Sequence, residues 1–310
     1  MGNQRIGIIG NFSWRYSAEQ DWRIAFQDEG YRTEILNERT ASVTNVLDLA
    51  ERVDVLLWIS SCFRFGHDVM EQANKLTTTV GWHADLFFGL SRVGWKSMPM
   101  WSAQHILTAD GGNDDKWQKL GINHHWMLPA TRKKWTQTTG RTMRRMVCDV
   151  AFVGNDGSGY HKSWPYRVEL NLELQKMCQR NGWTFMNPGG MQRRIERNQA
   201  MNDFYRSAKV TIGDSLCFDK ENARYWSDRV YEATGRNGLL VMPQINALQD
   251  DFGDSLLMYP WGDWQTLEHM ITDLLADEQR RNELRAAGRA HTSRNHTYNN
   301  RVHELLEIVT

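Results

Sequence analysis

The sequence has few cysteines and no long apolar run, and each shortage narrows the classes of protein to which it can belong. Its four cysteines, Cys62, Cys148, Cys178 and Cys217, stand far apart and form no Cys-x-x-Cys pair. This argues against a structural zinc site and predicts free thiols in a reducing compartment. No signal-peptide pattern precedes the first strand pattern, and no apolar stretch reaches the ~18 residues of a membrane span. We therefore expect a cytoplasmic protein, in the host cytoplasm if its source is a virus.

The chain also lacks an excess of either charge. Lys plus Arg and Asp plus Glu both number 37, so the whole molecule has no net field that would draw it to nucleic acid or to a membrane. Its 310 residues exceed the usual size of one hydrophobic core, and 41% hydrophobic residues are typical of a globular protein. Two domains of about 150 residues are expected.

Strand and helix patterns alternate along both halves of the chain. In the first half, strands are expected at 5–10, 31–36, 53–59 and 77–80, and helices at 19–29, 46–52 and 69–75. In the second half, strands are expected at 148–153, 183–186, 209–213 and 238–242, and helices at 166–180, 199–207, 227–234 and 264–276. This alternation predicts an α/β protein with parallel sheets covered by helices on both faces. We place the domains at 1–140 and 141–310, with the polar segment 132–145 at their junction.

The segment 225–241 is the most informative part of the chain. Ser227 is expected to cap a helix that ends near Gly235, before an apolar strand. Arg229 and Glu232 then lie three residues apart on one face of that helix, near its N-terminus. The unpaired N–H groups there and Arg229 suit a diphosphate, and Glu232, one turn deeper, suits the hydroxyl pair of a ribose. Together these are the parts of a nucleotide-sugar site.

The same residues carry a family resemblance. Ser-x-Arg-x-x-Glu, followed by a glycine and an apolar strand, resembles the donor-binding helix of GT-B glycosyltransferases of group 1, particularly the CgeB-like branch (spore maturation protein B). The segments 148–155, 204–212 and 296–302 fit that pattern in the same order. The resemblance implies two facing Rossmann-like domains with a cleft between them, an acceptor-side N-terminal domain and a donor-binding C-terminal domain. It also implies that the last helix, about 296–310, packs back on the N-terminal domain.

Further donor-side candidates follow the strands of the second domain. Gly154 and Asn155 begin a glycine-rich loop, 153–159, in which backbone N–H groups can approach a phosphate, although such a cluster is also common in plain turns. Arg167, at the start of the next helix, is a second phosphate candidate or else a solvated charge. Ser215, in the loop after a strand, either binds a phosphate or only caps a turn.

One position departs from the family pattern. Many retaining GT-B enzymes carry two glutamates eight positions apart, the first contacting the donor sugar and the second the ribose. Glu232 matches the second, whereas Arg224 stands at the first. We keep Arg224 as a donor-binding candidate and name Asp219 or Glu221 as possible substitutes for the missing glutamate.

The acceptor-side candidates follow a strand of the first domain. A transferase must take a proton from the acceptor hydroxyl, and an Asp or His within hydrogen-bond reach can do so. Asp85 is the candidate base and His83 the group that polarises the donor or the acceptor. The alternative is an Asp that caps the next helix beside a packed His. Asp110, in a second polar turn, is the weaker candidate.

The segment 132–145 is strongly basic. Its cationic residues include Arg132, Lys133, Lys134, Arg144 and Arg145, and it contains no acidic residue. Taken alone it is typical of a solvated linker. Because Lys and Arg contacts supply most non-specific affinity for nucleic acid, these residues are also candidates to contact a polyanionic acceptor such as DNA.

The sequence thus predicts a glycosyltransferase that moves a sugar from a nucleoside-diphosphate sugar, in particular a uridine one, to a hydroxyl acceptor on a small molecule, glycan or protein. A viral-type enzyme acting on hydroxymethylated DNA bases, a non-catalytic nucleotide-sugar binder and an NAD-dependent oxidoreductase are the alternatives. The last is weakened because no Gly-x-Gly-x-x-Gly motif is present. No cofactor or metal is expected, because adjacent His124 and His125 on a strand point to opposite faces and GT-B enzymes characteristically need no metal.

Overall fold

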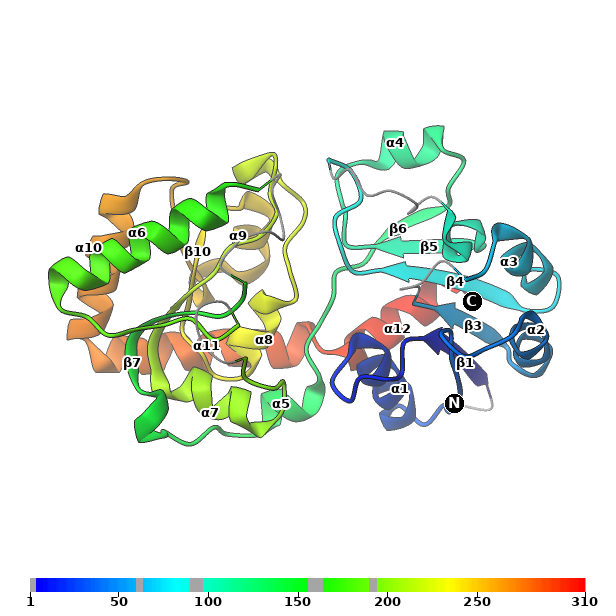
Figure 1. Ribbon diagram of the computed structural model, residues 1–310, viewed down its shortest axis with the longest axis horizontal. Helices are drawn as coiled ribbons and strands as arrows, with labels where there is room; N and C mark the ends of the chain where they lie inside the picture. The colour runs from blue at the N-terminus through cyan, green and yellow to red at the C-terminus, as the bar shows by residue number, and fades with distance from the viewer. Residues whose placement is uncertain (1–3, 60–63, 90–96, 156–163, 190–193, 310) are drawn as a thin grey trace. The chain divides into compact units, whose positions relative to one another are not determined.

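The structure, a computed structural model, describes residues 4–59, 64–89, 97–155, 164–189 and 194–309. The chain divides into two compact units (Figure 1). The first contains residues 1–132 and 298–310, and the second contains residues 133–297. The expected boundary at 140/141 therefore falls inside the second unit, and the last helix belongs to the first.

The first unit is built on a parallel sheet of six strands in the order β2-β1-β3-β4-β5-β6. The strands are β1 (Arg5–Gly10), β2 (Arg32–Asn37), β3 (Val55–Trp58), β4 (Thr78–His83), β5 (His105–Thr108) and β6 (His124–Trp126). Its helices are α1 (Ala18–Asp28), α2 (Val43–Arg52), α3 (His67–Ala73), α4 (Asp114–Lys119) and α12 (Tyr298–Val309).

Helices cover both faces of this sheet because alternate strand residues point to opposite sides (Figure 1). Ile8 packs with Trp22 of α1 and Val302 of α12 in one core cluster. Its neighbour Ile9 packs with Val46 of α2 in another. Helix α12 is tied to the same unit by the Arg301 Nε donating to the Leu128 carbonyl at 2.8 Å.

The second unit contains a parallel sheet of five strands in the order β11-β10-β9-β7-β8. The strands are β7 (Cys148–Phe152), β8 (Phe185–Met186), β9 (Ala208–Ile212), β10 (Leu240–Pro243) and β11 (Leu257–Tyr259). Its helices are α5 (Lys133–Gln137), α6 (Tyr166–Asn181), α7 (Gln199–Ser207), α8 (Arg229–Gly235), α9 (Asn246–Phe252), α10 (Trp264–Ala276) and α11 (Glu278–Asn295). Leu174 of α6 and Ile271 of α10 pack with Val150 and Val210 in its core. The expected α/β class is confirmed for both units.

The basic segment 132–145 is not a solvated linker, which corrects one of the two interpretations of its sequence. Trp135 is buried, and the Asn202 amide of α7 donates to its carbonyl at 3.1 Å. A Cβ added at Gly140 would lie 2.1 Å from the Asn202 carbonyl oxygen. Residues 133–145 are thus packed against α7 as part of the second unit. Its charges still face solvent: Lys133, Lys134, Arg144 and Arg145 are exposed, and Arg132 is half-buried.

The structure bears on two expectations drawn from composition, one about membrane spans and one about the cysteines. Within them, no helix combines the length and the apolar character that crossing a membrane requires. Cys148, Cys178 and Cys217 are buried free thiols, and Cys62 lies outside the described residues.

Candidate functional site

The second unit contains a cavity of about 300 Å³ at the carboxyl end of β7. Strand β7 pairs with β8 on one side and with β9 on the other, so the strand order reverses there. Ligands of open parallel sheets bind at such a reversal, beyond the carboxyl ends of the strands. The cavity is lined by Val153, Gly154, Asn155, Pro188, Gly189, Arg194, Ile195, Arg197, Met201, Tyr205, Arg229 and Glu232.

Arg229 lies against the backbone of the first loop. A Cβ added at Gly154 would lie 3.0 Å from the Arg229 Nη2 and 3.2 Å from its Cζ, and Gly154 has a φ of +149° that other residues rarely adopt. Gly154 therefore permits the guanidinium group to approach the chain closely. The rest of this loop, including Gly157 and Gly159, lies outside the described residues.

A buried carboxylate sits behind the Arg229 guanidinium group. Asp214, in the loop after β9, is fully buried and accepts hydrogen bonds from the Arg167 Nε at 2.9 Å and the Trp164 Nε1 at 3.2 Å. The Arg229 Nη1 is 3.9 Å from Asp214 and forms no hydrogen bond with the residues that the structure describes. Asp214 thus positions Arg229 through its charge, and Arg229 is one of the residues that line the cavity.

Glu232 reaches the same cavity from the next turn of α8. Its Oε2 accepts a hydrogen bond from the Arg236 Nε at 2.8 Å, with both side chains buried. Arg236 also donates to the Asn202 Oδ1 at 2.6 Å and to the Asn198 carbonyl at 3.2 Å. Its Cζ lies 4.7 Å from the centroid of the Trp135 ring. The carboxylate at the cavity is therefore held in place by a buried, fully engaged arginine.

The remaining charged groups make the cavity predominantly positive. Among the described residues, Arg194 and Arg197 join Arg229 in its lining, against the single carboxylate of Glu232. Arg197 forms an ion pair with Asp228, the residue before α8. Burial opposes the ionisation of Asp228, but the adjacent charges of Arg197 and Arg229 outweigh it and lower its pKa. A cavity of this kind favours a polyanion such as a diphosphate.

The other predicted donor residues are placed differently. Arg167 is engaged with Asp214 and does not line the cavity. Arg224 is exposed and lies outside the lining. Ser215 is buried, and its Oγ accepts a hydrogen bond from the Ser227 amide at 3.0 Å, which is the turn-capping role given as its alternative.

The predicted cap of α8 was wrong. The residue before the helix is Asp228, which makes no side-chain capping hydrogen bond, and Ser227 is fixed through its backbone amide by Ser215. Helix α8 has only seven residues. The dipole of a helix is the sum of its aligned peptide dipoles, so a helix this short contributes little to binding an anion. The anion site therefore depends more on the side chains than on the N-terminus of α8.

The acceptor-side candidates lie at the carboxyl end of β4 in the first unit. His83 is buried with its ring 5.7 Å from that of Trp101, and Asp85 is half-buried two residues later. Asp110 has a structural role, because it accepts hydrogen bonds from the amides of Phe87 and Phe88 at 3.0 and 2.7 Å. Asp110 thereby fixes the loop that carries Asp85.

The side chains of the adjacent histidines on β6 contact different partners. The His124 Nε2 lies 2.8 Å from the Thr108 hydroxyl, whereas the His125 Nε2 lies 3.4 Å from the His105 Nδ1. Burial lowers the pKa of His124 to about 4, so its ring is neutral at physiological pH.

A comparison with known protein families shows to which family the chain belongs. Residues 132–307, more than half of the chain, match the glycosyl transferase-like family. The chain belongs to this family. The narrower resemblance to the CgeB-like branch stays a prediction. No curated protein matches the sequence significantly.

Solved structures show the fold of this glycosyltransferase over its full length. An alpha-glucosyltransferase in complex with UDP-glucose and DNA superposes with a TM-score of 0.67 at 10% identity, over 99% of both chains. HepE of Anabaena in complex with UDP-glucose gives 0.57 at 12% identity, over 99% of this chain and 100% of its own. A DNA-modifying beta-glucosyltransferase gives 0.59 at 11% identity, over 98% and 99%. The predicted GT-B fold is confirmed.

Sequence analysis missed three residues that build the site. Asp214 follows β9, the position where parallel sheets place functional side chains, and could have been found by that signal. Tyr205 of α7 lines the cavity, and burial raises its pKa, so that its hydroxyl stays a neutral donor. Arg236 carried no signal, because arginine is rarely fully buried.

Proposed function

We propose that the cavity of the second unit binds the nucleoside diphosphate of a sugar donor, in particular UDP, and that the enzyme transfers the sugar to a hydroxyl acceptor. The observation that carries this proposal is the pair on α8: Arg229 and Glu232 line one cavity, and the Arg229 side chain is 21% exposed. A guanidinium group suits the diphosphate, and a fixed carboxylate suits the ribose hydroxyls. Uridine is favoured because related structures hold UDP or UDP-glucose.

The chemistry assigned to the cavity is electrostatic. As the bond between the sugar and the diphosphate breaks, negative charge grows on the departing phosphate oxygens. Arg229, already oriented by Asp214 and Gly154, stabilises that charge without reorganising. Asp85 is proposed as the base for the acceptor hydroxyl and His83 as the polarising group. We propose that this step needs no metal or other cofactor.

The donor site is tested with the substitution Glu232→Gln. The amide keeps an oxygen for Arg236 but loses the charge that binds both ribose hydroxyls, so we expect UDP affinity to fall by about 10-fold, the equivalent of a lost charge-assisted hydrogen bond. Isothermal titration calorimetry with UDP measures the change. Glu283→Gln, on the exposed face of α11, is the matched control and should bind UDP like the wild type. Equal affinity of Glu232→Gln and wild type would remove Glu232 from the site.

A modified DNA base is the second candidate acceptor. Four of the similar structures are DNA-modifying or DNA-bound glucosyltransferases. Lys133, Lys134, Arg144 and Arg145 of this chain are exposed and stand close together in sequence. The cytoplasmic location also stays a prediction.

Gel-shift titrations with a duplex containing hydroxymethylated bases test this acceptor. If DNA binds through the exposed cations, affinity falls steeply with salt, and replacing Lys133 and Lys134 together by Ala lowers the slope of log K against log salt by about 2. Lys176 and Arg280, also exposed, provide the matched control pair. Contacts between cations and phosphates are strongest at low salt, roughly 20–50 mM. If the protein does not shift the duplex even there, DNA is excluded as the acceptor, and a small molecule, glycan or protein remains.

A further inference from the structure

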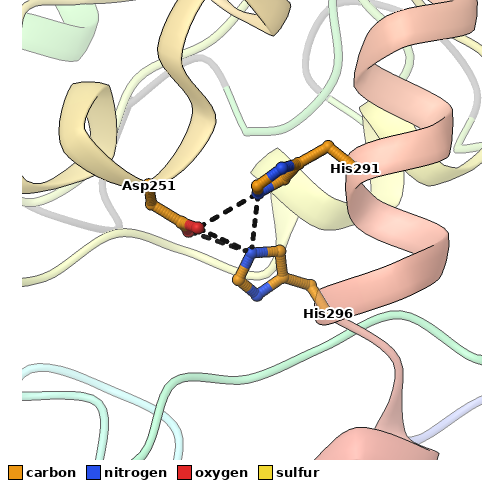
Figure 2. A group of neighbouring side chains, drawn as sticks. All are labelled: Asp251, His291 and His296. Carbon is orange, nitrogen blue, oxygen red and sulfur yellow. Dashed lines mark hydrogen bonds and ion pairs between the residues drawn. The ribbon is translucent and has the colours of Figure 1, made fainter.

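We propose that Asp251, His291 and His296 form a binding site for a divalent transition-metal ion, with zinc as the preferred ion. Figure 2 shows the three side chains converging on one point from two elements. Asp251 belongs to α9, His291 lies near the C-terminal end of α11, and His296 is the residue that follows α11. Within the described residues this is the group of His, Cys, Asp and Glu side chains whose ligand atoms are close enough to share an ion. It shares no residue with the cavity lining.

The spacing of the ligand atoms fits a metal centre. The His291 Nε2 lies 3.0 Å from Asp251 Oδ1, and the His296 Nε2 lies 2.9 Å from Asp251 Oδ2. The two Nε2 atoms are 3.2 Å apart. Ligands bound tetrahedrally at 2.0–2.2 Å from a zinc ion are separated by about 3.3 Å. A small outward shift of each side chain therefore makes room for the ion.

The convergence of two imidazole nitrogens is itself informative. A neutral imidazole has one N–H and one lone pair, and when the hydrogen is on Nδ1 the Nε2 lone pair of each ring points toward the centre of this cluster. A cation at the centre satisfies both lone pairs and the carboxylate together. Two imidazoles and one carboxylate are a ligand set that suits zinc better than calcium or magnesium, which prefer oxygen.

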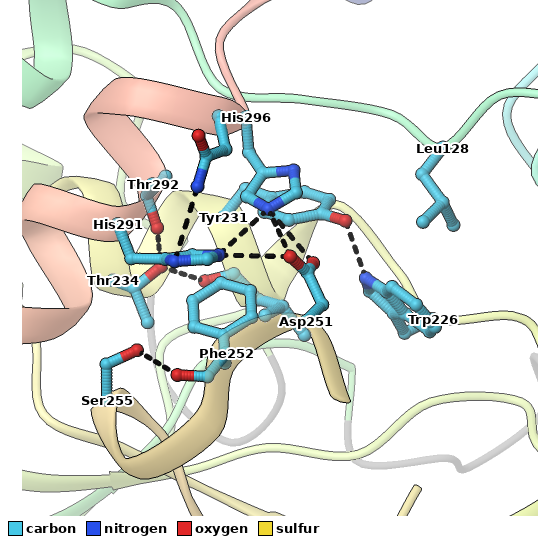
Figure 3. Close-up of polar contacts among 12 residues, drawn as sticks. Leu128, Trp226, Tyr231, Thr234, Asp251, Phe252, Ser255, His291, Thr292 and His296 are labelled. Carbon is cyan, nitrogen blue, oxygen red and sulfur yellow. Dashed lines mark hydrogen bonds and ion pairs between the residues drawn. The ribbon is translucent and has the colours of Figure 1, made fainter. Parts of the chain in front are cut away.

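The surroundings hold the two rings in this orientation (Figure 3). The His296 ring stacks on Tyr231 at 4.5 Å and on Phe252 at 5.5 Å, and the His291 ring lies 4.4 Å from Phe252. The Asn295 Nδ2 lies 3.3 Å from the His291 Nδ1, and turning this amide by 180° places its oxygen there, where it accepts the Nδ1–H and leaves the Nε2 lone pair for a metal. Such outer partners fix the tautomer and direction of ligating histidines.

Access and position suggest what the ion would do. The side chains of His291 and Asp251 are 20% and 26% exposed, so an ion can enter and keep a water molecule as its fourth ligand. The ion would fasten the end of α11 to α9. Through the His296–Tyr231 stack and the contact of 2.6 Å between the Thr234 and Thr292 hydroxyls, the same junction supports α8, which carries Arg229 and Glu232. The assigned role is therefore structural.

Zinc binding is measured on the full chain without a histidine tag, after treatment with a chelator. We expect calorimetry at neutral pH to give one zinc ion per chain, and zinc to raise the melting temperature. Asp251→Asn and His296→Phe, the second of which keeps the aromatic stack, should each weaken binding at least tenfold. His269→Asn, at an exposed histidine of α10, is the control and should bind zinc like the wild type.

X-ray absorption of the wild-type zinc complex gives a second readout that does not depend on the stability of any variant. A shell with two imidazoles and light N or O ligands is expected. A wild-type chain that binds no zinc, a zinc shell without imidazole, or affinity unchanged in both Asp251→Asn and His296→Phe would overturn the proposal and leave a hydrogen-bonded His–Asp–His cluster. None of these outcomes bears on UDP binding, so the donor site is judged separately.

Discussion

Arg229→Ala is expected to lower kcat for sugar transfer by about 10²–10³-fold, the effect of removing one pre-oriented donor from a developing negative charge. The guanidinium group is fixed between the Gly154 backbone and the Asp214 carboxylate, so its position is already set before the donor binds. Ala removes the charge and the donors of this cavity-lining guanidinium group. Release of nucleoside diphosphate from the sugar donor that the wild type uses, followed in the steady state with an acceptor present, measures the change.

Two further variants separate this role from a general loss of structure. Arg229→Lys keeps the charge but not the planar pair of donors, and should recover only part of kcat. Arg280→Ala, at an exposed arginine of α11, should leave kcat unchanged. Asp214 keeps its hydrogen bonds from Arg167 when Arg229 is removed, so the fold should persist by circular dichroism. A kcat within threefold of wild type for Arg229→Ala would exclude the assigned role.

Regular amphipathic elements were predictable from sequence because their apolar spacing reports their buried face. Helices α7 and α10 have the bounds expected from periodicity, 199–207 and 264–276. Helix α11, with 18 residues, was missed for a physical reason. Its buried face includes Arg281 and Arg285, which donate to the Leu274 and Ala208 carbonyls. A helix that docks through buried guanidinium groups shows no apolar stripe.

The same limit applies to the functional residues. Helical spacing was enough to place Arg229 and Glu232 together, because residues three apart on a helix share a face. It could not show that His291 and His296 meet Asp251, which lies 40 residues or more away in sequence. Helical spacing also could not show that α8 lacks a side-chain cap. The start of α8 depends on the hydrogen bond between the Ser227 amide and the loop after β9. Contacts of this kind depend on tertiary packing.

Arg236→Met is expected to reduce the free energy of unfolding by about 3–5 kcal/mol, because it leaves the buried Glu232 carboxylate without its cation. Arg236 is 1% exposed, and its three guanidinium nitrogens are engaged with Glu232, Asn202 and backbone carbonyls. Met fills a similar volume but donates no hydrogen bond. Urea unfolding of the full chain measures the loss, and Arg280→Met, on the exposed side of α11, should change stability by less than about 0.5 kcal/mol.

The double variant Glu232→Gln with Arg236→Met decides whether the loss comes from the pair. Since the amide that replaces the Glu232 carboxylate is neutral, removing Arg236 no longer strands a buried charge, and the double variant should be more stable than Arg236→Met alone by about 1–3 kcal/mol. Strict additivity of the two substitutions would show that Arg236 acts only through Asn202 and Trp135. Because the pair holds the carboxylate at the cavity, Arg236→Met should also weaken UDP binding, even though Arg236 itself does not line the cavity.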